Sequence, residues 1–195
     1  MPRPLPSLPR HPGRVYRTRD LRRWSANPTR LATRLVEEGS LRRLGHGLYT
    51  RPGTGRFGEV PPRDEEILRA FLGGAPYVVT GPPAWNALGL GATAVRVDTL
   101  VYNTKRSGTF RLAGRAFQLR RVAFPRQPSR EWFVVDLLNH AEAAGVSRRE
   151  VLDRALRQAA TGRLDADRLR DMAKRYGRKS VRRQLEAALT ASAAT

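Results

Sequence analysis

The chain has 195 residues, of which 37 are lysine or arginine and 17 are aspartate or glutamate, and its formal net charge is +20. It contains no cysteine, which excludes disulfides, thiolate catalysis and zinc fingers. A hydrophobic content of 40% is enough for a folded core, and no apolar run is as long as a membrane span. The N-terminus also lacks the apolar core of a signal peptide, so we expect a cytoplasmic protein without membrane contact.

The positive charge indicates an anionic partner, because such a surface attracts polyanions and binds them in a salt-dependent way. Arginine greatly outnumbers lysine. A GC-rich genome produces the same skew, so the preference for arginine over lysine is not counted as evidence for an anionic partner. The distribution of charge is more informative. Residues 1–57 hold 13 arginines against three acidic residues, which is half of the net charge in under a third of the chain.

The first residues predict an arm followed by a strand and a helix. Residues 1–13 contain five prolines and no hydrophobic periodicity, which is typical of a loosely ordered segment. A short strand is predicted over residues 15–17. The hydroxyl of Thr18 can accept a hydrogen bond from a free amide of a helix running to about Trp24, so Thr18 is predicted to cap that helix.

A second helix is predicted to begin at Asn27 and Pro28. Asparagine is a good N-cap, and proline at the first helical position loses no needed donor. Gly39 is predicted to end this helix, because glycine readily adopts the left-handed conformation. Two strands, residues 41–44 and 48–50, then flank Gly45-His46-Gly47, a turn that permits a tight hairpin.

The order strand, helix, turn, helix and hairpin is that of a winged helix-turn-helix, whose second helix can enter the major groove of DNA. We therefore predict a winged helix-turn-helix DNA-binding domain over residues 14–57. Apolar residues fall on one side of the second helix and would pack on the first helix: Leu31, Ala32, Leu35 and Val36.

The other side of the second helix carries hydroxyl and guanidinium groups that suit guanine edges and phosphates: Thr29, Arg30, Thr33 and Arg34. Three basic residues of the hairpin and the arginine that follows it are predicted to hold phosphates: Arg42, Arg43, His46 and Arg51. For His46, plain exposure to solvent is an equally good interpretation. The alternative for the whole segment is an ordinary helical hairpin with a charged, solvated face.

Prolines at positions 52, 61 and 62 predict a junction, and a mixed α/β segment follows it. An amphipathic helix is predicted over residues 63–72, and a short helix after Gly81-Pro82-Pro83. Strands are predicted over residues 77–80, 95–102, 109–112 and 116–122. From Arg130 the pattern is helical, with helices over residues 131–144, 147–160, 165–176 and 180–189, the second opened by a capping box at Ser147. The predicted fold class is α+β: a winged helix-turn-helix, a mixed segment and a helical tail.

No pattern of catalytic residues is found. The three histidines are far apart in the sequence, and His140 shares its predicted helix with apolar residues, which favours a structural role. Asp64, Glu65 and Glu66 stand at a helix start, where acids stabilise the helix dipole without any metal. The prolines after Gly81 remove the amides that a phosphate loop needs. We therefore expect a protein that is not an enzyme and that has no metal site and no cofactor.

Three segments together resemble the AbiEi-type antitoxins of bacterial type IV toxin–antitoxin systems: E-E-G-S-L-R-R-L-G-H-G-L-Y-T at residues 37–50, A-W-N-A-L-G-L at 84–90 and F-Q-L-R-R-V at 117–122. The likeness extends over nearly all of residues 15–190. It implies that the winged helix represses the operon's own promoter at inverted repeats. It also implies that the C-terminal domain, residues 63–190, counteracts a toxin with a nucleotidyltransferase fold. The chain departs from the family in having a proline-rich arm where its members often have an additional helix.

Basic residues of the tail could serve a second stretch of DNA, an acidic patch on the toxin, or solubility alone. We expect contact with the toxin or its nucleic-acid substrate, because a nucleotidyltransferase active site needs carboxylates for its metal. The residues of this predicted antitoxicity surface are Arg175, Arg178, Lys179, Arg182 and Arg183. Two other functions remain open: a stand-alone winged-helix repressor without a toxin partner, and an enzyme, which the missing site disfavours.

Overall fold

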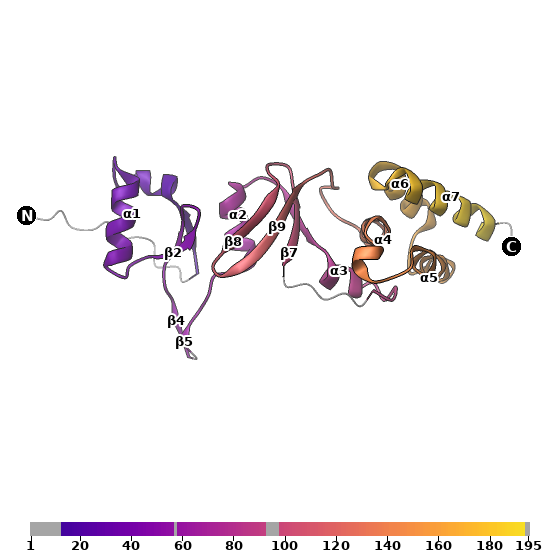
Figure 1. The fold of residues 1–195 in the computed structure, drawn as a ribbon, viewed down its shortest axis with the longest axis horizontal. Coiled ribbons are helices and arrows are strands. Elements are labelled where there is room, and N and C mark those ends of the chain that lie inside the picture. The colour runs from indigo at the N-terminus through magenta and orange to yellow at the C-terminus, as the bar shows by residue number, and fades with distance from the viewer. Residues whose placement is uncertain (1–12, 57, 93–97, 194–195) are drawn as a thin grey trace, which may run out of the picture. The chain divides into compact units, whose positions relative to one another are not determined.

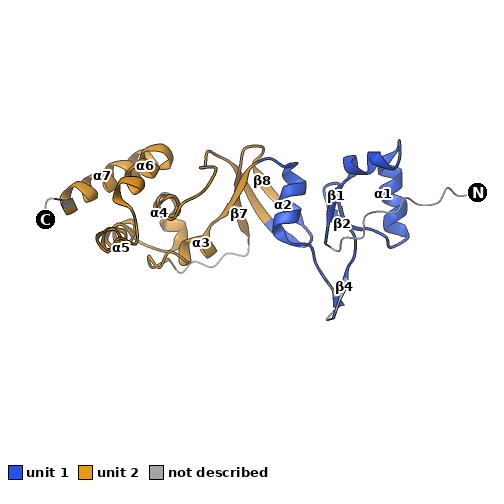
Figure 2. Ribbon diagram, turned by 180° about the vertical axis from the view of Figure 1, so that it is seen from behind, with its two compact units in different colours: residues 1–75, 110–116 blue, residues 76–109, 117–195 orange. Residues whose placement is uncertain are grey.

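The computed structural model describes residues 13–56, 58–92 and 98–193 (Figure 1). Most of the proline-rich arm, and the first residues of the strand expected from Val95, lie outside the described residues. The fold is mixed α+β, and the chain divides into two compact units (Figure 2). Unit 1 comprises Met1–Ala75 and Phe110–Ala116, and unit 2 comprises Pro76–Thr109 and Phe117–Thr195. Over the described ranges, no helix is both long and apolar enough to cross a membrane.

Unit 1 contains a three-stranded antiparallel sheet with the strand order β1-β3-β2. The strands are β1 (Val15–Arg17), β2 (Arg42–Gly45) and β3 (Leu48–Thr50), as expected from the sequence. The turn between β2 and β3 has positive φ at Gly45, His46 and Gly47, with values of 114°, 47° and 70°. Glycine tolerates this conformation, which is why the turn is flanked by two of them.

Between β1 and β2 the chain first forms η1 (Thr18–Arg23), a 3-10 helix. The expectation that Thr18 caps this helix is wrong. The carboxylate of Asp20 accepts the backbone amide of Arg17 at 2.9 Å and pairs with its guanidinium at 2.7 Å. The Thr18 hydroxyl instead donates to the carbonyl oxygen of Gly47, at 3.3 Å. The helix therefore begins one residue earlier than expected, with Thr18 as its first residue and Arg17 in the N-cap position.

The helix α1 (Pro28–Glu37) confirms the predicted start and end signals. The side chain of Asn27 accepts a hydrogen bond from the amide of Arg30 at 3.0 Å, and Gly39 adopts a φ of 72° just beyond the last turn. The apolar side of α1 is buried in a small core with residues of η1 and of the sheet: Tyr16, Leu21, Leu31, Ala32, Leu35, Leu41 and Tyr49. The helix is therefore amphipathic, with its opposite side left to solvent.

The helix α2 (Asp64–Leu72) belongs to unit 1 and packs on β1 and β3. Its apolar residues Ile67, Leu68 and Leu72 are fully buried. Just before α2, the two-residue strands β4 (Thr54–Gly55) and β5 (Gly58–Glu59) form a small hairpin that the sequence did not predict. The first unit thus continues through the predicted junction.

Residues 110–116 also belong to unit 1, although they are distant in sequence. The amide of Ala113 donates to the carbonyl of Leu44 at 2.9 Å. The guanidinium of Arg115 pairs with Asp64 at 2.7 Å and donates to the carbonyl of Pro62 at 2.7 Å. Asp64 therefore has an ion-pair partner.

A four-stranded sheet has the strand order β6-β7-β9-β8; its residues 110–112 and 115–116 are counted with unit 1 and the remainder with unit 2. Its strands are β6 (Tyr77–Thr80), β7 (Thr99–Asn103), β8 (Gly108–Leu112) and β9 (Arg115–Arg121). Strands β6 and β7 are antiparallel, whereas β7 and β9 are parallel, with Thr99 opposite Phe117.

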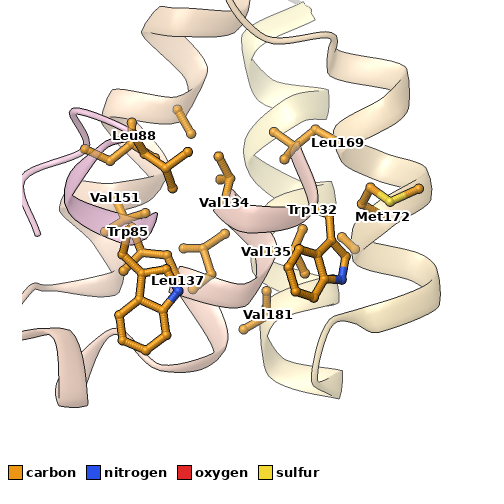
Figure 3. Packing of buried hydrophobic residues seen from close by; sticks show 14 of the residues in the cluster. Trp85, Leu88, Trp132, Val134, Val135, Leu137, Val151, Leu169, Met172 and Val181 are labelled. Atoms are coloured by element: carbon orange, nitrogen blue, oxygen red, sulfur yellow. The ribbon is translucent and has the colours of Figure 1, made fainter. Parts of the chain in front are cut away.

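The helix α4 (Arg130–Asn139) is at the centre of the core of unit 2, and nearly all of its residues are buried. Its side chains meet those of the surrounding helices, as Figure 3 shows for Trp132, Val134 and Leu137. The surrounding helices are α3 (Pro82–Asn86), α5 (Arg148–Ala160), α6 (Ala166–Tyr176) and α7 (Lys179–Ala193). A helix that is buried on all sides lacks the one-sided pattern of a surface helix.

The helix expected over residues 131–144 is interrupted, which corrects the sequence prediction. After Asn139 the chain leaves the helix, and η2 (Glu142–Ala144) is a separate 3-10 turn. The reason is the side chain of His140, whose Nδ1 bonds the Asp136 carbonyl at 2.9 Å, the acceptor that the helix would otherwise use. The expected capping box at Ser147 is also wrong: Ser147 occupies the N-cap position of α5, but its side chain forms no capping hydrogen bond.

Candidate nucleic-acid interface

The solvent side of α1 carries the four residues predicted to contact DNA bases. All four are exposed: Thr29, Arg30, Thr33 and Arg34. With Ser25, Asn27 and Glu37, three of them line a hollow of about 540 Å³ on this side of the helix. The structure thus brings the predicted set together on one surface of unit 1.

The two arginines of α1 differ in their surroundings. Among the described residues, the Arg30 guanidinium has no hydrogen-bond or ion-pair partner. The Nε of Arg34 lies 3.9 Å from the Glu38 carboxylate, and both side chains are substantially exposed, at 44% and 38%. Such an exposed pair is worth little, so Arg34 can exchange it for a phosphate or a base. The Thr33 hydroxyl donates to the Thr29 carbonyl, at 3.2 Å.

The hairpin arginines are arranged less favourably for joint contact. Arg42 and Arg43 are both exposed on β2, the edge strand of the sheet, opposite Thr50 and Tyr49 respectively. Consecutive residues of a strand point to opposite faces of a sheet. A phosphate on one face of the sheet can therefore be contacted by only one of the two guanidinium groups.

Arg51 is half-buried. Arg51 and Arg14 both lie near the hydroxyl of Tyr16. Burial raises the pKa of Tyr16, and the charges of Arg14 and Arg51 partly oppose that rise. The guanidinium carbon of Arg14 also lies 5.5 Å from the centre of the Tyr16 ring, within cation–π range. Arg14 is a basic residue of this surface that sequence reasoning missed, because it precedes the first strand.

His46 lies in the β2–β3 turn, and its ring is engaged by aromatic neighbours. The ring centre is 5.9 Å from that of Phe71 and 5.5 Å from that of Phe110, and the two phenylalanines are themselves 4.8 Å apart. All three residues belong to unit 1. The imidazole thus helps to close a small aromatic cluster, while His46 as a residue remains exposed.

The predicted antitoxicity residues do not share one hollow. Arg175 pairs with Asp171 at 3.4 Å, and its guanidinium carbon lies 5.4 Å from the Tyr176 ring centre, in a hollow that also contains Arg126 and Arg168. A second set lines a hollow between α6 and α7: Lys179, Arg182 and Arg183. Arg178 borders a third, smaller cavity. The five residues therefore offer three separate basic sites.

A buried polar network in unit 2 was not predicted from the sequence, which suggested only a structural role for His140. Asp136 is 3% exposed and accepts hydrogen bonds from Thr80 Oγ1 at 2.6 Å, Trp85 Nε1 at 2.9 Å and Tyr102 OH at 2.8 Å. The Nδ1 of His140 lies 3.4 Å from the same carboxylate. The spacing of Asp136 and His140, four residues apart on one helix, is the one local sign of this network.

No protein-family profile matches the chain, and no curated protein matches it either. Within the described ranges, no group of three or more histidine, aspartate or glutamate side chains is arranged to hold a metal ion. The likeness to AbiEi-type antitoxins therefore depends on the three sequence segments alone.

Proposed function

We propose that the protein is a DNA-binding antitoxin that represses its own operon through a winged helix-turn-helix in residues 14–57. The observation that carries the proposal is the exposed side of α1, where Arg30 and Arg34 stand one turn apart. Guanidinium groups in this arrangement suit guanine edges in a major groove and the phosphates beside it.

The packing of α2 adds support to this proposal. Members of the family that the sequence resembles often have an additional helix where this chain has the proline-rich arm. In this chain α2 packs on β1 and β3 and buries Ile67, Leu68 and Leu72. We infer that α2 completes the DNA-binding domain from the C-terminal side, so that the functional domain extends to about residue 75.

The antitoxic half of the proposal concerns unit 2. Following the resemblance, its partner is a nucleotidyltransferase-like toxin, and the three basic hollows are the candidate contact sites. The alternative is a stand-alone winged-helix repressor whose second unit binds an effector. The neighbouring gene separates them, since a nucleotidyltransferase-like reading frame beside this one favours the antitoxin.

Binding of the full chain to the DNA upstream of its own gene tests the proposal. Wild-type protein should prefer this DNA to a scrambled duplex, and the double variant Arg30→Ala/Arg34→Ala should lose the preference, because each good base contact supplies about 1–3 kcal/mol of discrimination. The matched control is Arg149→Ala/Arg157→Ala, which removes two exposed arginines from α5. An Arg30/Arg34 variant that keeps the preference while folded would refute the assignment of α1 as the recognition helix.

A further inference from the structure

Unit 2 contains a small cavity, of about 220 Å³, beside the buried carboxylate of Asp136. Strands β7 and β9 provide Tyr102 and Arg120, α4 and its C-cap provide Asp136 and His140, and the junction of α6 and α7 provides Arg178. We call it the Arg120–Arg178 cavity. It is independent of the DNA-binding side of α1, which lies in unit 1.

The carboxylate of Asp136 accepts its hydrogen bonds from groups other than the two arginines. Its Oδ2 accepts from Thr80 and Trp85, and its Oδ1 accepts from Tyr102 and lies near His140. Burial alone would raise the pKa of Asp136, but these donors and the nearby imidazole lower it, so the group is ionised. Within the described part of the chain, Asp136 forms no ion pair with Arg120 or Arg178.

The two guanidinium groups are therefore not directly paired with a carboxylate. Among the described residues, neither Arg120 nor Arg178 forms a salt bridge, and the one side-chain partner of the Arg120 guanidinium is Nε2 of His140 at 3.3 Å. Both arginines are close to the Tyr102 hydroxyl: burial and the bonded Asp136 carboxylate raise the pKa of Tyr102, and the charges of Arg120 and Arg178 oppose the rise. Two positive charges thus converge on one small space.

The ring of His140 also lines the Arg120–Arg178 cavity. Its Nδ1 lies 2.9 Å from the backbone carbonyl of Asp136, and because a carbonyl only accepts, Nδ1 carries the proton. Nε2 then faces Arg120 at 3.3 Å and the hydroxyl of Tyr102 at 3.4 Å. Stacking on Trp85, with ring centres 5.5 Å apart, holds the imidazole in this position.

The position of Arg178 is set by the neighbouring residue Asn139. The Oδ1 of Asn139 accepts the backbone amide of Arg178 at 2.8 Å, and its Nδ2 donates to the carbonyl of Tyr176 at 3.1 Å. These two bonds join the end of α4 to the junction of α6 and α7. The second cation is therefore held at the cavity by its backbone, while its exposed side chain remains free to adjust to a ligand.

We propose that the Arg120–Arg178 cavity binds a phosphate group, with Arg120 and Arg178 as its cationic ligands. Arginine presents planar sets of N–H donors that match phosphate oxygens. The cavity is smaller than the pockets of about 300–1,000 Å³ that enclose whole small molecules, so it admits the phosphate rather than an entire metabolite. The remainder of a larger ligand would extend into the neighbouring hollow, which shares Tyr176 with the cavity and carries Arg126, Arg168 and Arg175.

Titration calorimetry of the full chain with inorganic phosphate and with adenosine 5′-monophosphate tests the proposal. At least one probe should bind saturably at one site, and Arg120→Gln and Arg178→Gln should each weaken binding at least about tenfold, which equals about 1.4 kcal/mol. The matched control is Arg121→Gln, because Arg121 is the next residue of β9 and points to the other face of the sheet. Arg30→Ala/Arg34→Ala serves as a second control, because it removes the proposed DNA contacts of unit 1.

The outcomes separate clearly. Equal affinity for the two probes assigns the cavity to free phosphate, and tighter binding of the nucleotide assigns it to a phosphate carried on a nucleoside; both support the site. The proposal is overturned if neither probe saturates at millimolar concentration, or if Arg120→Gln binds as Arg121→Gln does. It is also overturned if Arg30→Ala/Arg34→Ala abolishes binding of the probes, because the phosphate would then bind to unit 1.

Discussion

The ring of His140 stacks on the indole of Trp85, with the two ring planes 16° apart and both side chains directed to Asp136. Trp85 is part of the A-W-N-A-L-G-L segment, one of the three on which the family resemblance depends. Trp85 therefore ties this segment to a buried polar network, and Leu88 and Leu90 of the same segment are in the core.

Replacing Asp136 with Asn should destabilise unit 2 by about 1.5–3 kcal/mol, the usual value of hydrogen bonds to a charged group. The folded pKa of Asp136 is lowered. Its contribution is therefore complete above the ordinary pKa of an aspartate and is lost as the pH falls through the folded value. Urea unfolding should show the full difference between wild type and variant at pH 7 and a smaller one below about pH 4. A difference that does not change with pH would contradict an ionised Asp136.

Single substitutions of Arg42 and Arg43 should have unequal effects on DNA binding, because the two residues lie on opposite faces of the sheet edge. Loss of the one that contacts phosphate should weaken binding to all sequences alike and reduce the salt dependence by about 0.9 in slope. Fluorescence anisotropy at several salt concentrations measures both quantities. Equal losses for Arg42→Ala and Arg43→Ala would argue against the hairpin geometry as the basis of contact.

Substitution of His46 separates packing from phosphate contact. His46→Phe keeps an aromatic ring against Phe71 and Phe110 but loses the ring nitrogens, whereas His46→Ala loses both. If packing is its role, His46→Ala should lower the free energy of unfolding by about 0.5–1.5 kcal/mol and His46→Phe should not. DNA affinity reports the other role: a loss in His46→Phe, with stability retained, identifies a phosphate contact.

The contribution of α2 to the proposed DNA-binding domain can be measured with two fragments. A fragment of residues 1–57 lacks the buried side chains of Ile67, Leu68 and Leu72, and a fragment of residues 1–75 retains them. We expect the longer fragment to melt at higher temperature and to bind DNA more tightly, because a domain of about 60 residues has a thin core. Thermal melting followed by circular dichroism gives the comparison, and identical melting curves would show that α2 is dispensable.

Growth rescue with a co-expressed toxin tests the three basic hollows of unit 2 one at a time. The variants are Arg175→Ser, Arg178→Ser and the triple change Lys179→Ser/Arg182→Ser/Arg183→Ser. If one hollow contacts the toxin, its variant alone should lose rescue while repression of the promoter is retained. Rescue by all three variants would mean that these basic residues are not how the protein neutralises its partner.

Elements with local signals were predictable from the sequence. Asn27, Pro28 and Gly39 define the ends of α1 by short-range chemistry, and the bounds of β1 and β6 follow from short apolar runs between turn residues. The prediction for Thr18 was wrong because its hydroxyl bonds the carbonyl of Gly47, which is distant in sequence, while Asp20 bonds the backbone and side chain of Arg17 at the N-cap. A local propensity rule does not see the contact with Gly47.

The polar network could not be predicted, because its members come from β6, α3, β7 and α4. Thr80 and Asp136 are 56 residues apart in the chain, and their hydrogen bond depends on the packing of the whole unit. The same holds for the cluster of His46, Phe71 and Phe110, which joins three distant segments. Contacts of this kind depend on the tertiary structure, and almost nothing in the local sequence indicates them.

One turn of α4 links the interior of unit 2 to its surface. Asp136, Asn139 and His140 are spaced three and four residues apart and so lie on one side of the helix that forms the centre of the core. A ligand that engages Arg120 and Arg178 is therefore connected, through this turn, to the joint between α6 and α7. If the cavity binds phosphate as proposed, occupancy stabilises the folded state by mass action, and the free energy of unfolding of the second unit should rise with the concentration of the anion.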